Sequence, residues 1–181
     1  HDGDVWVCTD HGINLYDRAT RQLLNFIVYD KTGKYSTAWA YDILQDRKGR
    51  IWMASYQGGI FVMEKQRLVA AIAHAASGTA TCVADYHFSD KGQNALSGLH
   101  VGQMVLDGKG MIWASSHDHL DRIDPYTMRV AHIGGNDAIN YLMASGNGNV
   151  WVGYNASVKC YMVNLPMKGK EVDSKEWKIG D

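Results

Sequence analysis

The chain has 181 residues, of which 46% are hydrophobic and 20% charged, with 18 Lys and Arg against 19 Asp and Glu. This balance is typical of a folded globular protein, and the lack of a strongly basic run argues against nucleic acid or an anionic membrane surface as a partner. No apolar run approaches the roughly 20 residues that cross a bilayer. Because the chain opens with His1 and no leader pattern, we expect it to be a piece of a longer protein.

Glycine, tryptophan and tyrosine are frequent, with 19, 6 and 10 residues, whereas proline occurs only 2 times. Aromatic residues favour pleated strands and glycine favours tight turns, so the composition indicates an all-β fold. The cysteines are odd in number and far apart, so they define neither a disulfide framework nor a metal knuckle, and their redox state stays open. They are Cys8, Cys82 and Cys160.

Four strands are predicted around tryptophans that share a local pattern. A glycine stands three residues before each tryptophan, and an Asp or Ser stands six residues before the last three of them. A carboxylate or hydroxyl there can hydrogen-bond the backbone of a turn in which the glycine adopts a positive φ angle, which predicts a hairpin. The four tryptophans are Trp6, Trp52, Trp113 and Trp151, and the turn residues are Asp46, Asp107 and Ser145.

Each of these strands is apolar on both faces. Trp52, for example, stands between Ile51 and Met53, and the small residue Ala54 follows two positions after the tryptophan. A strand of this kind needs a covering sheet on each side, because its side chains alternate between two faces that are both apolar. The pattern therefore predicts sheets stacked against one another.

An apolar strand precedes each hairpin and a second strand follows each tryptophan. Acidic residues at the end of that second strand predict a polar turn into a further strand; they are Asp17, Glu64 and Asp124. Four-stranded units that are apolar on both faces bury themselves by radial stacking. We therefore predict an all-β fold, a β-propeller fragment of about four four-stranded antiparallel blades.

The blades are expected near residues 1–30, 38–74, 100–133 and 138–179 of a single partial propeller over 1–181, with an insertion at 75–96. The first blade lacks its innermost strand. Two explanations stay open: the chain is cut from the middle of something longer, or its C-terminal strand near Trp177 completes that blade.

Three stretches resemble the two-component regulator propeller repeat. They are HDGDVWVCTDHGINLYDRAT at residues 1–20, QDRKGRIWMASYQGGIFVME at 45–64 and LDGKGMIWASSHDHLDRIDPYT at 106–127. This repeat is characteristic of the periplasmic sensor domains of hybrid two-component systems in Bacteroidetes-type gut bacteria. The resemblance implies a periplasmic domain of an inner-membrane sensor that recognises an oligosaccharide and signals to a histidine kinase outside this chain.

Ligand-binding residues are expected on the propeller rim, where the turns between second and third strands and the segments between blades emerge. Amides, imidazoles and aromatic rings there suit sugar hydroxyls and sugar faces. The candidates are His11, Trp39, Tyr56, Gln57, His100, His117, Asp118, Tyr154 and Asn155. Asp10, Tyr35, Asn136 and Asn140 belong to the same loops.

His117 and His119 share one side of an extended segment and could both face a metal ion, but the sequence identifies no third ligand. We therefore predict no metal site and no cofactor. The recurring acidic residues at the second-strand ends mark a structural turn and not a catalytic pair. No catalytic residue is predicted for this chain, which we expect not to be an enzyme.

Two other functions remain open. Streptogramin-type lyases and lactonases are also propellers, and His11 and His117 are the imidazoles that such an enzyme would use here. The blades could instead serve only in structure or dimerisation. Because four blades leave an apolar sheet at each end, we also expect self-association, including a homodimer with an eight-bladed ring, or imperfect closure.

Overall fold

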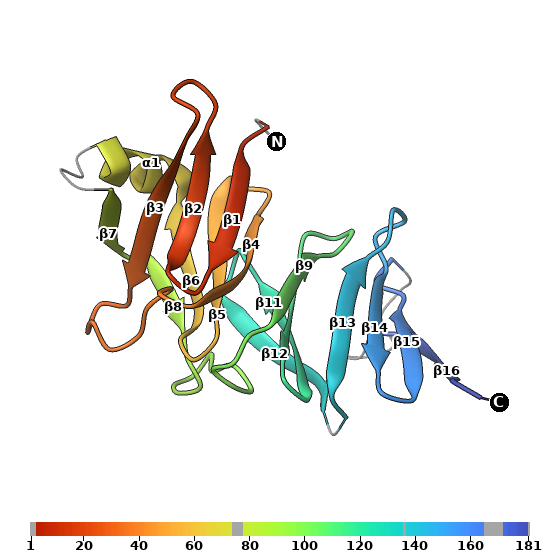
Figure 1. Cartoon of the computed structure of the whole chain (residues 1–181). Coiled ribbons are helices and arrows are strands. Elements are labelled where there is room, and N and C mark those ends of the chain that lie inside the picture. The colour runs from red at the N-terminus through yellow and green to blue at the C-terminus, as the bar shows by residue number, and fades with distance from the viewer. Residues whose placement is uncertain (1–2, 74–77, 136, 165–171, 181) are drawn as a thin grey trace.

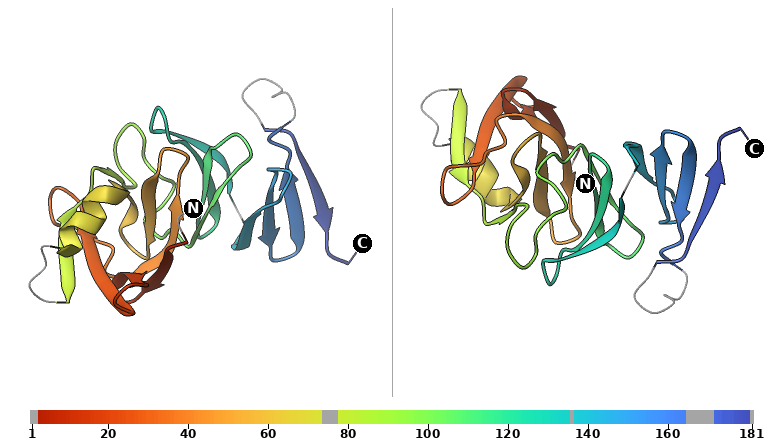
Figure 2. Two further views of the ribbon diagram at one scale, coloured as in Figure 1. Left: turned by 90° about the horizontal axis from the view of Figure 1, so that it is seen from above. Right: turned by 90° about the horizontal axis from the view of Figure 1, so that it is seen from below.

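The structure is a computed structural model that describes residues 3–73, 78–135, 137–164 and 172–180. Within these residues it contains four four-stranded sheets and one short helix (Figure 1). Figure 2 shows the sheets standing beside one another in chain order, each turned relative to the last, from the first sheet to the C-terminal one. The predicted all-β fold and its division into four propeller blades are therefore confirmed.

The first sheet has the order β1-β2-β3-β7. Its strands are β1 (Val5–Thr9), β2 (Gly12–Asp17), β3 (Gln22–Tyr29) and β7 (Thr79–Val83). β1 carries Trp6, whereas the corresponding tryptophans lie on the second strand of the other sheets, so the described residues of this sheet include no innermost strand. Its fourth strand, β7, comes from the expected insertion at 75–96, so the bounds 1–30 that we expected for this blade are wrong. β7 pairs with β3 in parallel, which differs from a wholly antiparallel blade because β7 is reached by a crossover and not by a hairpin.

The second sheet has the order β4-β5-β6-β8. Its strands are β4 (Ala40–Gln45), β5 (Arg50–Ser55), β6 (Gly59–Glu64) and β8 (Tyr86–Phe88). We expected its fourth strand before residue 74, but helix α1 (Lys65–Ala73) occupies that segment, and the fourth strand comes from within the expected insertion. The polar turn expected at Glu64 is therefore wrong: the helix starts at the next residue, and the Glu64 N–H donates to Asp85 at 2.9 Å.

The third and fourth sheets are wholly antiparallel, with the orders β9-β10-β11-β12 and β13-β14-β15-β16 and one register shift in each. Their strands are β9 (Gln103–Leu106), β10 (Ile112–Ser116), β11 (His119–Asp124), β12 (Arg129–Gly135), β13 (Ile139–Ala144), β14 (Val150–Tyr154), β15 (Ser157–Tyr161) and β16 (Ser174–Lys178). Trp177 lies in β16, which pairs with β15, so the alternative that this strand completes the first blade is wrong.

The Asp-Gly hairpins before the tryptophan strands of the second and third sheets form as predicted. The Asp46 carboxylate accepts hydrogen bonds from the N–H groups of Lys48 and Arg50, and Gly49 has a φ angle of 83°. The same carboxylate also accepts the indole N–H of Trp52 at 2.9 Å, an interaction that the sequence did not reveal. Asp107 repeats the arrangement in the third sheet, where the Trp113 indole donates to it at 2.8 Å.

Three apolar cores lie between successive sheets. Trp6 packs in the first core, between sheets one and two, whereas Trp52 and Trp113 are fully buried in the second and third. Because each core takes side chains from two neighbouring sheets, a sheet without a neighbour leaves one apolar face uncovered. These shared cores hold each sheet against the next.

Candidate functional site

The predicted rim loops lie together at one end of the sheets. Backbone hydrogen bonds join the turn after one tryptophan strand to the segment that leads into the next sheet: Gly12 N–H donates to Ala38 O at 2.9 Å, and Gly59 N–H donates to Leu99 O at 2.9 Å. At the third junction Ile139 N–H donates to His117 O at 3.0 Å. These bonds align the loops of adjacent blades.

Five aromatic rings from sheets two and three form a continuous cluster on this rim, which we call the aromatic arc. Ring centroids are 4.5 Å apart for Trp39 and Tyr56 and 4.6 Å apart for Tyr56 and His100. Tyr41 lies 5.6 Å from Tyr56 and 5.5 Å from His100, and His117 lies 6.4 Å from His100. The side chains of the arc are Trp39, Tyr41, Tyr56, His100 and His117.

The arc arises from equivalent positions in two successive repeats. Trp39 and His100 each stand seven residues before the hairpin aspartate of their sheet, and Tyr56 and His117 each stand four residues after the tryptophan. In the fourth sheet the equivalents of Trp39 and Tyr56 are Ala138 and Asn155, and in the first sheet the equivalent of Tyr56 is Asp10. Because none of these residues has an aromatic ring, the arc is confined to the second and third sheets. His117 has a φ angle of 58°, a left-handed conformation that costs energy for a residue other than glycine.

The arc is accessible and borders a hollow. Trp39 is 49% exposed and Tyr41 41% exposed, which is unusual for rings of this size. A cavity of about 310 Å³ opens beside Trp39 and Tyr56 and is also lined by Gln57 and Ser36. Apolar ring faces and hydrogen-bonding groups therefore meet at one place.

His100 in the arc and Asp118 beside it have shifted pKa values. Partial burial, together with the nearby His117, lowers the pKa of His100, which keeps its imidazole neutral at neutral pH. Desolvation is the largest single influence on Asp118 and raises the pKa of its carboxyl group, but its hydrogen bonds, including one with His119 at 2.5 Å, and the nearby His119 and His117 together outweigh it and lower that pKa. His117 lies 3.7 Å from the same carboxylate.

Four of the predicted site residues belong to the arc: Trp39, Tyr56, His100 and His117. Gln57 lines the adjoining hollow, as does Tyr35. Asp118 follows His117 in the same turn. Their role in binding remains a prediction.

The other predicted site residues have partners outside the arc. His11 is exposed and pairs with Asp10 at 2.8 Å. Asn155 accepts a hydrogen bond from Asn140 at 3.0 Å, and Tyr154 lines a separate cavity of about 220 Å³ with Tyr161 and Lys159. Asn136 lies outside the described residues.

Tyr41 is the arc residue that sequence reasoning missed. It lies in β4, and the pattern assigned that strand to the core and not to the rim. Its spacing of two residues from Trp39 could have identified it, since alternate residues of a strand share a face. The ladder is irregular between Ala40 and Asp42, so spacing alone does not fix the direction of this side chain.

Within the described residues, no group of three or more His, Cys, Asp or Glu side chains is arranged to hold a metal ion. The three cysteines are unpaired. Burial raises the pKa of the Cys8 thiol to about 12, with a contribution from the nearby Asp42 carboxylate, so this thiol is not reactive at neutral pH.

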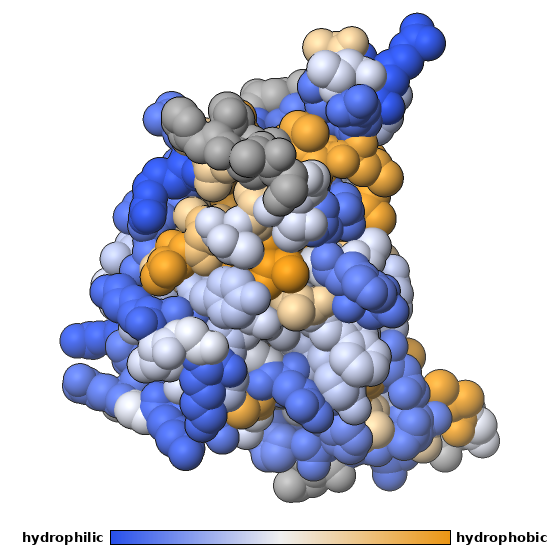
Figure 3. Space-filling model, turned by 60° about the vertical axis from the view of Figure 1, so that its left-hand side comes forward, coloured by the Kyte–Doolittle hydropathy of each residue, from blue (hydrophilic) through white to orange (hydrophobic). Residues whose placement is uncertain are grey.

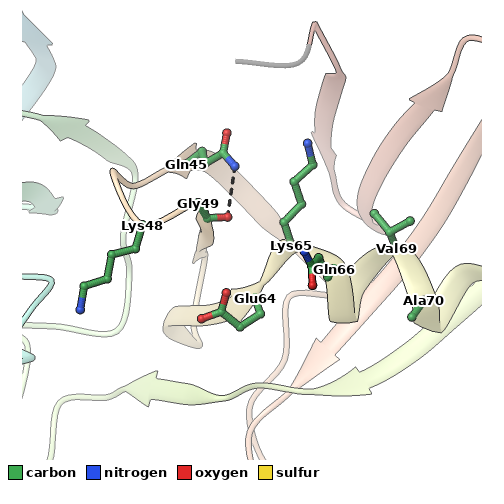
Figure 4. Close-up of a pocket in the computed structure, with 8 residues that line it drawn as sticks. All are labelled: Gln45, Lys48, Gly49, Glu64, Lys65, Gln66, Val69 and Ala70. Carbon is green, nitrogen blue, oxygen red and sulfur yellow. Dashed lines mark hydrogen bonds between the residues drawn. The ribbon is translucent and has the colours of Figure 1, made fainter.

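A cavity of about 670 Å³ lies at the opposite end of the second sheet, between the β4–β5 hairpin and helix α1 (Figure 4). Figure 4 shows Gln45 donating to the Gly49 carbonyl on one side of it and Val69 on the helix at the other. Figure 3 shows the face of the molecule that lies to the left in Figure 1, with hydrophobic patches separated by hydrophilic residues. None of the residues that line the cavity in Figure 4 is aromatic, so we centre the candidate site on the arc.

The sheets and the arc define a class: a segment of a β-propeller that presents an aromatic surface on its rim. Residues 34–57, which include Trp39, Tyr41 and Tyr56, match the two component regulator propeller family. The chain therefore carries the two-component regulator propeller repeat, as the sequence predicted.

Solved structures extend this similarity over the whole chain. Over 98% of its length the chain is similar to the extracellular domain of BT4673 from B. thetaiotaomicron, with TM-scores of 0.80 and 0.79 and identities of 31% and 30% in two structures. One structure describes that protein as a hybrid two component system and the other as a one component system. The chain spans 23% of the length of each of these relatives.

Two more distant structures show the fold alone. The extracellular domain of BT3049 from B. thetaiotaomicron, described as a hybrid two component system, has a TM-score of 0.66 and 17% identity over 98% of this chain and 22% of its own. A catalytically inactive virginiamycin B lyase from Staphylococcus aureus has a TM-score of 0.60 and 12% identity over 99% of this chain and 53% of its own. A search of curated proteins found no match.

Proposed function

We propose that this chain is part of the ligand-sensing propeller of an extracytoplasmic sensor, and that the aromatic arc binds an oligosaccharide. The sensor would be an inner-membrane hybrid two-component receptor whose periplasmic portion contains these blades and whose kinase lies elsewhere in the protein. The similarity to extracellular domains of two-component systems supports the sensor role. In the described part of the chain no helix has the length and apolar character needed to cross a membrane.

The exposed Trp39 ring, backed by Tyr56 at 4.5 Å, is the observation on which the ligand class rests. A sugar ring has an apolar face of C–H groups that packs on an aromatic ring, and hydroxyls around its edge that need hydrogen-bond partners. The arc supplies the ring faces, and Gln57, Ser36 and the neutral His100 supply donors and acceptors beside them. Rings held against one another lose little conformational entropy on binding.

The enzyme hypothesis finds less support in the contacts. His11 pairs with Asp10, whereas His117 contacts His100 and Asp118, so the two imidazoles have different partners. The similarity to the lyase, at 12% identity, concerns the fold alone. A purely structural role would leave Trp39 without a function that explains its exposure.

The test is calorimetric titration of the chain with neutral and acidic oligosaccharides released from plant cell-wall and host polysaccharides. We expect one group of sugars to bind and Trp39→Ala to weaken that binding by roughly 10- to 100-fold, as for a central aromatic anchor. The matched control is Tyr126→Ala, because Tyr126 is 55% exposed but lies in the β11–β12 turn at the opposite end of the third sheet.

The proposal is wrong if no oligosaccharide of the panel binds, or if Tyr126→Ala weakens binding as much as Trp39→Ala. Release of a modified sugar or ester product during titration would favour the enzyme instead. Circular dichroism of each variant checks that a lost signal does not come from unfolding.

A further inference from the structure

The hollow beside Trp39 and Tyr56 has one charged side chain in its lining, that of Lys34. The other described residues that line it are aromatic, uncharged polar or small, and no Asp or Glu is among them. A charged group of a ligand that entered the hollow would therefore meet a positive charge at its wall and no negative one.

The protein does not neutralise Lys34. Its ammonium group lies 4.8 Å from the centroid of the Tyr35 ring, and within the described residues it makes no ion pair. Interaction with Tyr35, more than the charges of Asp90 and Asp30, raises the pKa of Lys34, so this side chain is cationic at neutral pH. An ammonium group has three N–H donors, and one aromatic neighbour leaves donors for a ligand.

The loop that carries Lys34 is closed at its base by Asp30. The Asp30 N–H donates to Tyr35 O at 3.0 Å, and the Asp30 carboxylate accepts the Tyr35 N–H at 2.8 Å. The carboxylate also accepts the N–H and the hydroxyl of Thr32, at 3.1 and 2.5 Å. Burial raises the pKa of Asp30, but these hydrogen bonds and the nearby His87 outweigh it and lower that pKa to about 2. Asp30 is thus bonded within its own loop, and it holds the backbone of Lys34 beside the hollow.

The hollow has the size of a site for one sugar unit. Its volume of about 310 Å³ lies at the lower end of the range of roughly 300–1,000 Å³ for small-ligand sites. Trp39 and Lys34 line the same space, so a sugar ring packed on the indole has its edge substituents within reach of a long, flexible lysine side chain. Further units of an oligosaccharide would follow the arc toward His100 in the next sheet.

We propose that the sugar unit in the hollow is anionic and that its carboxylate or sulfate ester pairs with the Lys34 ammonium group, an inference that rests on the proposed oligosaccharide function. Lysine is a point charge with rotatable donors, so it pairs with either anion. Trp39 provides affinity for the ring of acidic and neutral sugars alike, because the ring face carries no charge. Lys34 then determines the preference for the acidic ones.

The test is calorimetric titration of the chain with oligogalacturonides, hyaluronan oligosaccharides and chondroitin sulfate oligosaccharides, each compared with its carboxyl-reduced form. Carboxyl reduction keeps the sugar ring and removes the charge. We expect an acidic sugar to bind roughly 5- to 20-fold more tightly than its neutral form, and Lys34→Gln to abolish this difference while Lys34→Arg retains it. Desulfation of the chondroitin sulfate oligosaccharides shows whether sulfate or carboxylate is the partner.

The matched control is Lys31→Gln. Lys31 is an exposed lysine of the same loop, but it lines a different cavity, of about 560 Å³. Removal of Lys31 should leave the preference for acidic sugars unchanged. Equal effects of the two substitutions, or a preference that persists in Lys34→Gln, would overturn the proposal.

The charge assignment and the sugar-binding function fail in different ways. If the acidic and neutral forms bind equally and Trp39→Ala weakens both, the arc is a sugar site and only the pairing with Lys34 is wrong. If neither form of any sugar binds, the sugar-binding function is wrong, and the inference about Lys34 falls with it. Far-UV circular dichroism confirms that each variant is folded.

Discussion

The hairpin aspartates both close the turn and bind the indole N–H of the following tryptophan. The Asp107 carboxylate accepts the N–H groups of Lys109 and Met111, which closes the turn, and accepts the Trp113 indole, which fixes the ring between two sheets. Arg122 lies 3.4 Å from the same carboxylate, whose side chain is fully buried. A buried carboxylate is stable only when its oxygens are satisfied in this way.

We expect Asp107→Ala to lower the free energy of unfolding by about 2–4 kcal/mol, because it removes charge-assisted hydrogen bonds and leaves a buried indole N–H without an acceptor. Ser145→Ala is the matched control: Ser145 stands at the equivalent position, but within the described residues its hydroxyl donates to Asn147 and Asn149 and not to an indole. We expect that change to cost less than about 1 kcal/mol. Urea unfolding measures both, and equal losses would contradict this account.

At the residue scale the sequence predicted the turn but not the indole contact. The Asp and Gly positions follow from backbone chemistry that each turn must satisfy locally. Whether the Trp113 side chain bends back to its own hairpin depends on the space between two sheets, which spacing does not describe. Likewise Trp39, Tyr56, His100 and His117 could be assigned to rim loops, but their contact across two blades required the structure.

At the scale of elements, helix α1 is the main departure from the sequence prediction. Its residues include a short apolar run that reads equally well as a strand or as a buried helix segment. Tertiary packing decides between them, since Leu68 is 1% exposed and joins the core between sheets one and two. Once the helix occupies that place, the second sheet takes its edge strand from residues 86–88.

We expect Leu68→Ala to lower the free energy of unfolding by about 2–4 kcal/mol, because it leaves a cavity in the first core. Val69→Ala, on the exposed side of the same helix, should change it by no more than about 0.5 kcal/mol. Chemical denaturation compares the two. A small effect of Leu68→Ala would mean that the helix contributes little to the core.

At the scale of the whole molecule, side chains link the innermost strands of neighbouring sheets. The Asp42 carboxylate accepts the Met104 N–H at 2.6 Å, and the Gln103 side-chain oxygen accepts the Leu142 N–H at 2.8 Å. Asp42 and Gln103 stand at equivalent positions, four residues before the hairpin aspartate. Burial raises the pKa of Asp42, although its hydrogen bonds oppose the shift.

We expect Gln103→Ala to speed hydrogen exchange of the Leu142 amide by roughly 5- to 10-fold, the loss of about 1 kcal/mol for one hydrogen bond. The Met104 amide, which is bonded to Asp42, should keep its exchange rate and serves as the internal control. Native-state exchange followed by NMR resolves both amides. Unchanged protection at Leu142 would show that apolar packing alone joins the third and fourth sheets.

The number of blades, and the strand order of the third and fourth sheets, could be predicted because one local pattern recurs along the chain. The route between the first two sheets could not, since β7 breaks the pattern: it comes after the second sheet's own third strand and yet pairs with β3. The repeated sequence pattern predicts the strands within one blade, but it carries no information on a connection that crosses from one blade to another.

That crossover has a mechanical consequence. The chain leaves the second sheet after β6, contributes β7 to the first sheet, and returns to the second sheet as β8. The backbone therefore crosses from the second sheet to the first and back again. The third and fourth sheets are each reached by a single passage of the chain. Under tension or torque we therefore expect the first two sheets to move together as one block, and the third and fourth sheets to separate first.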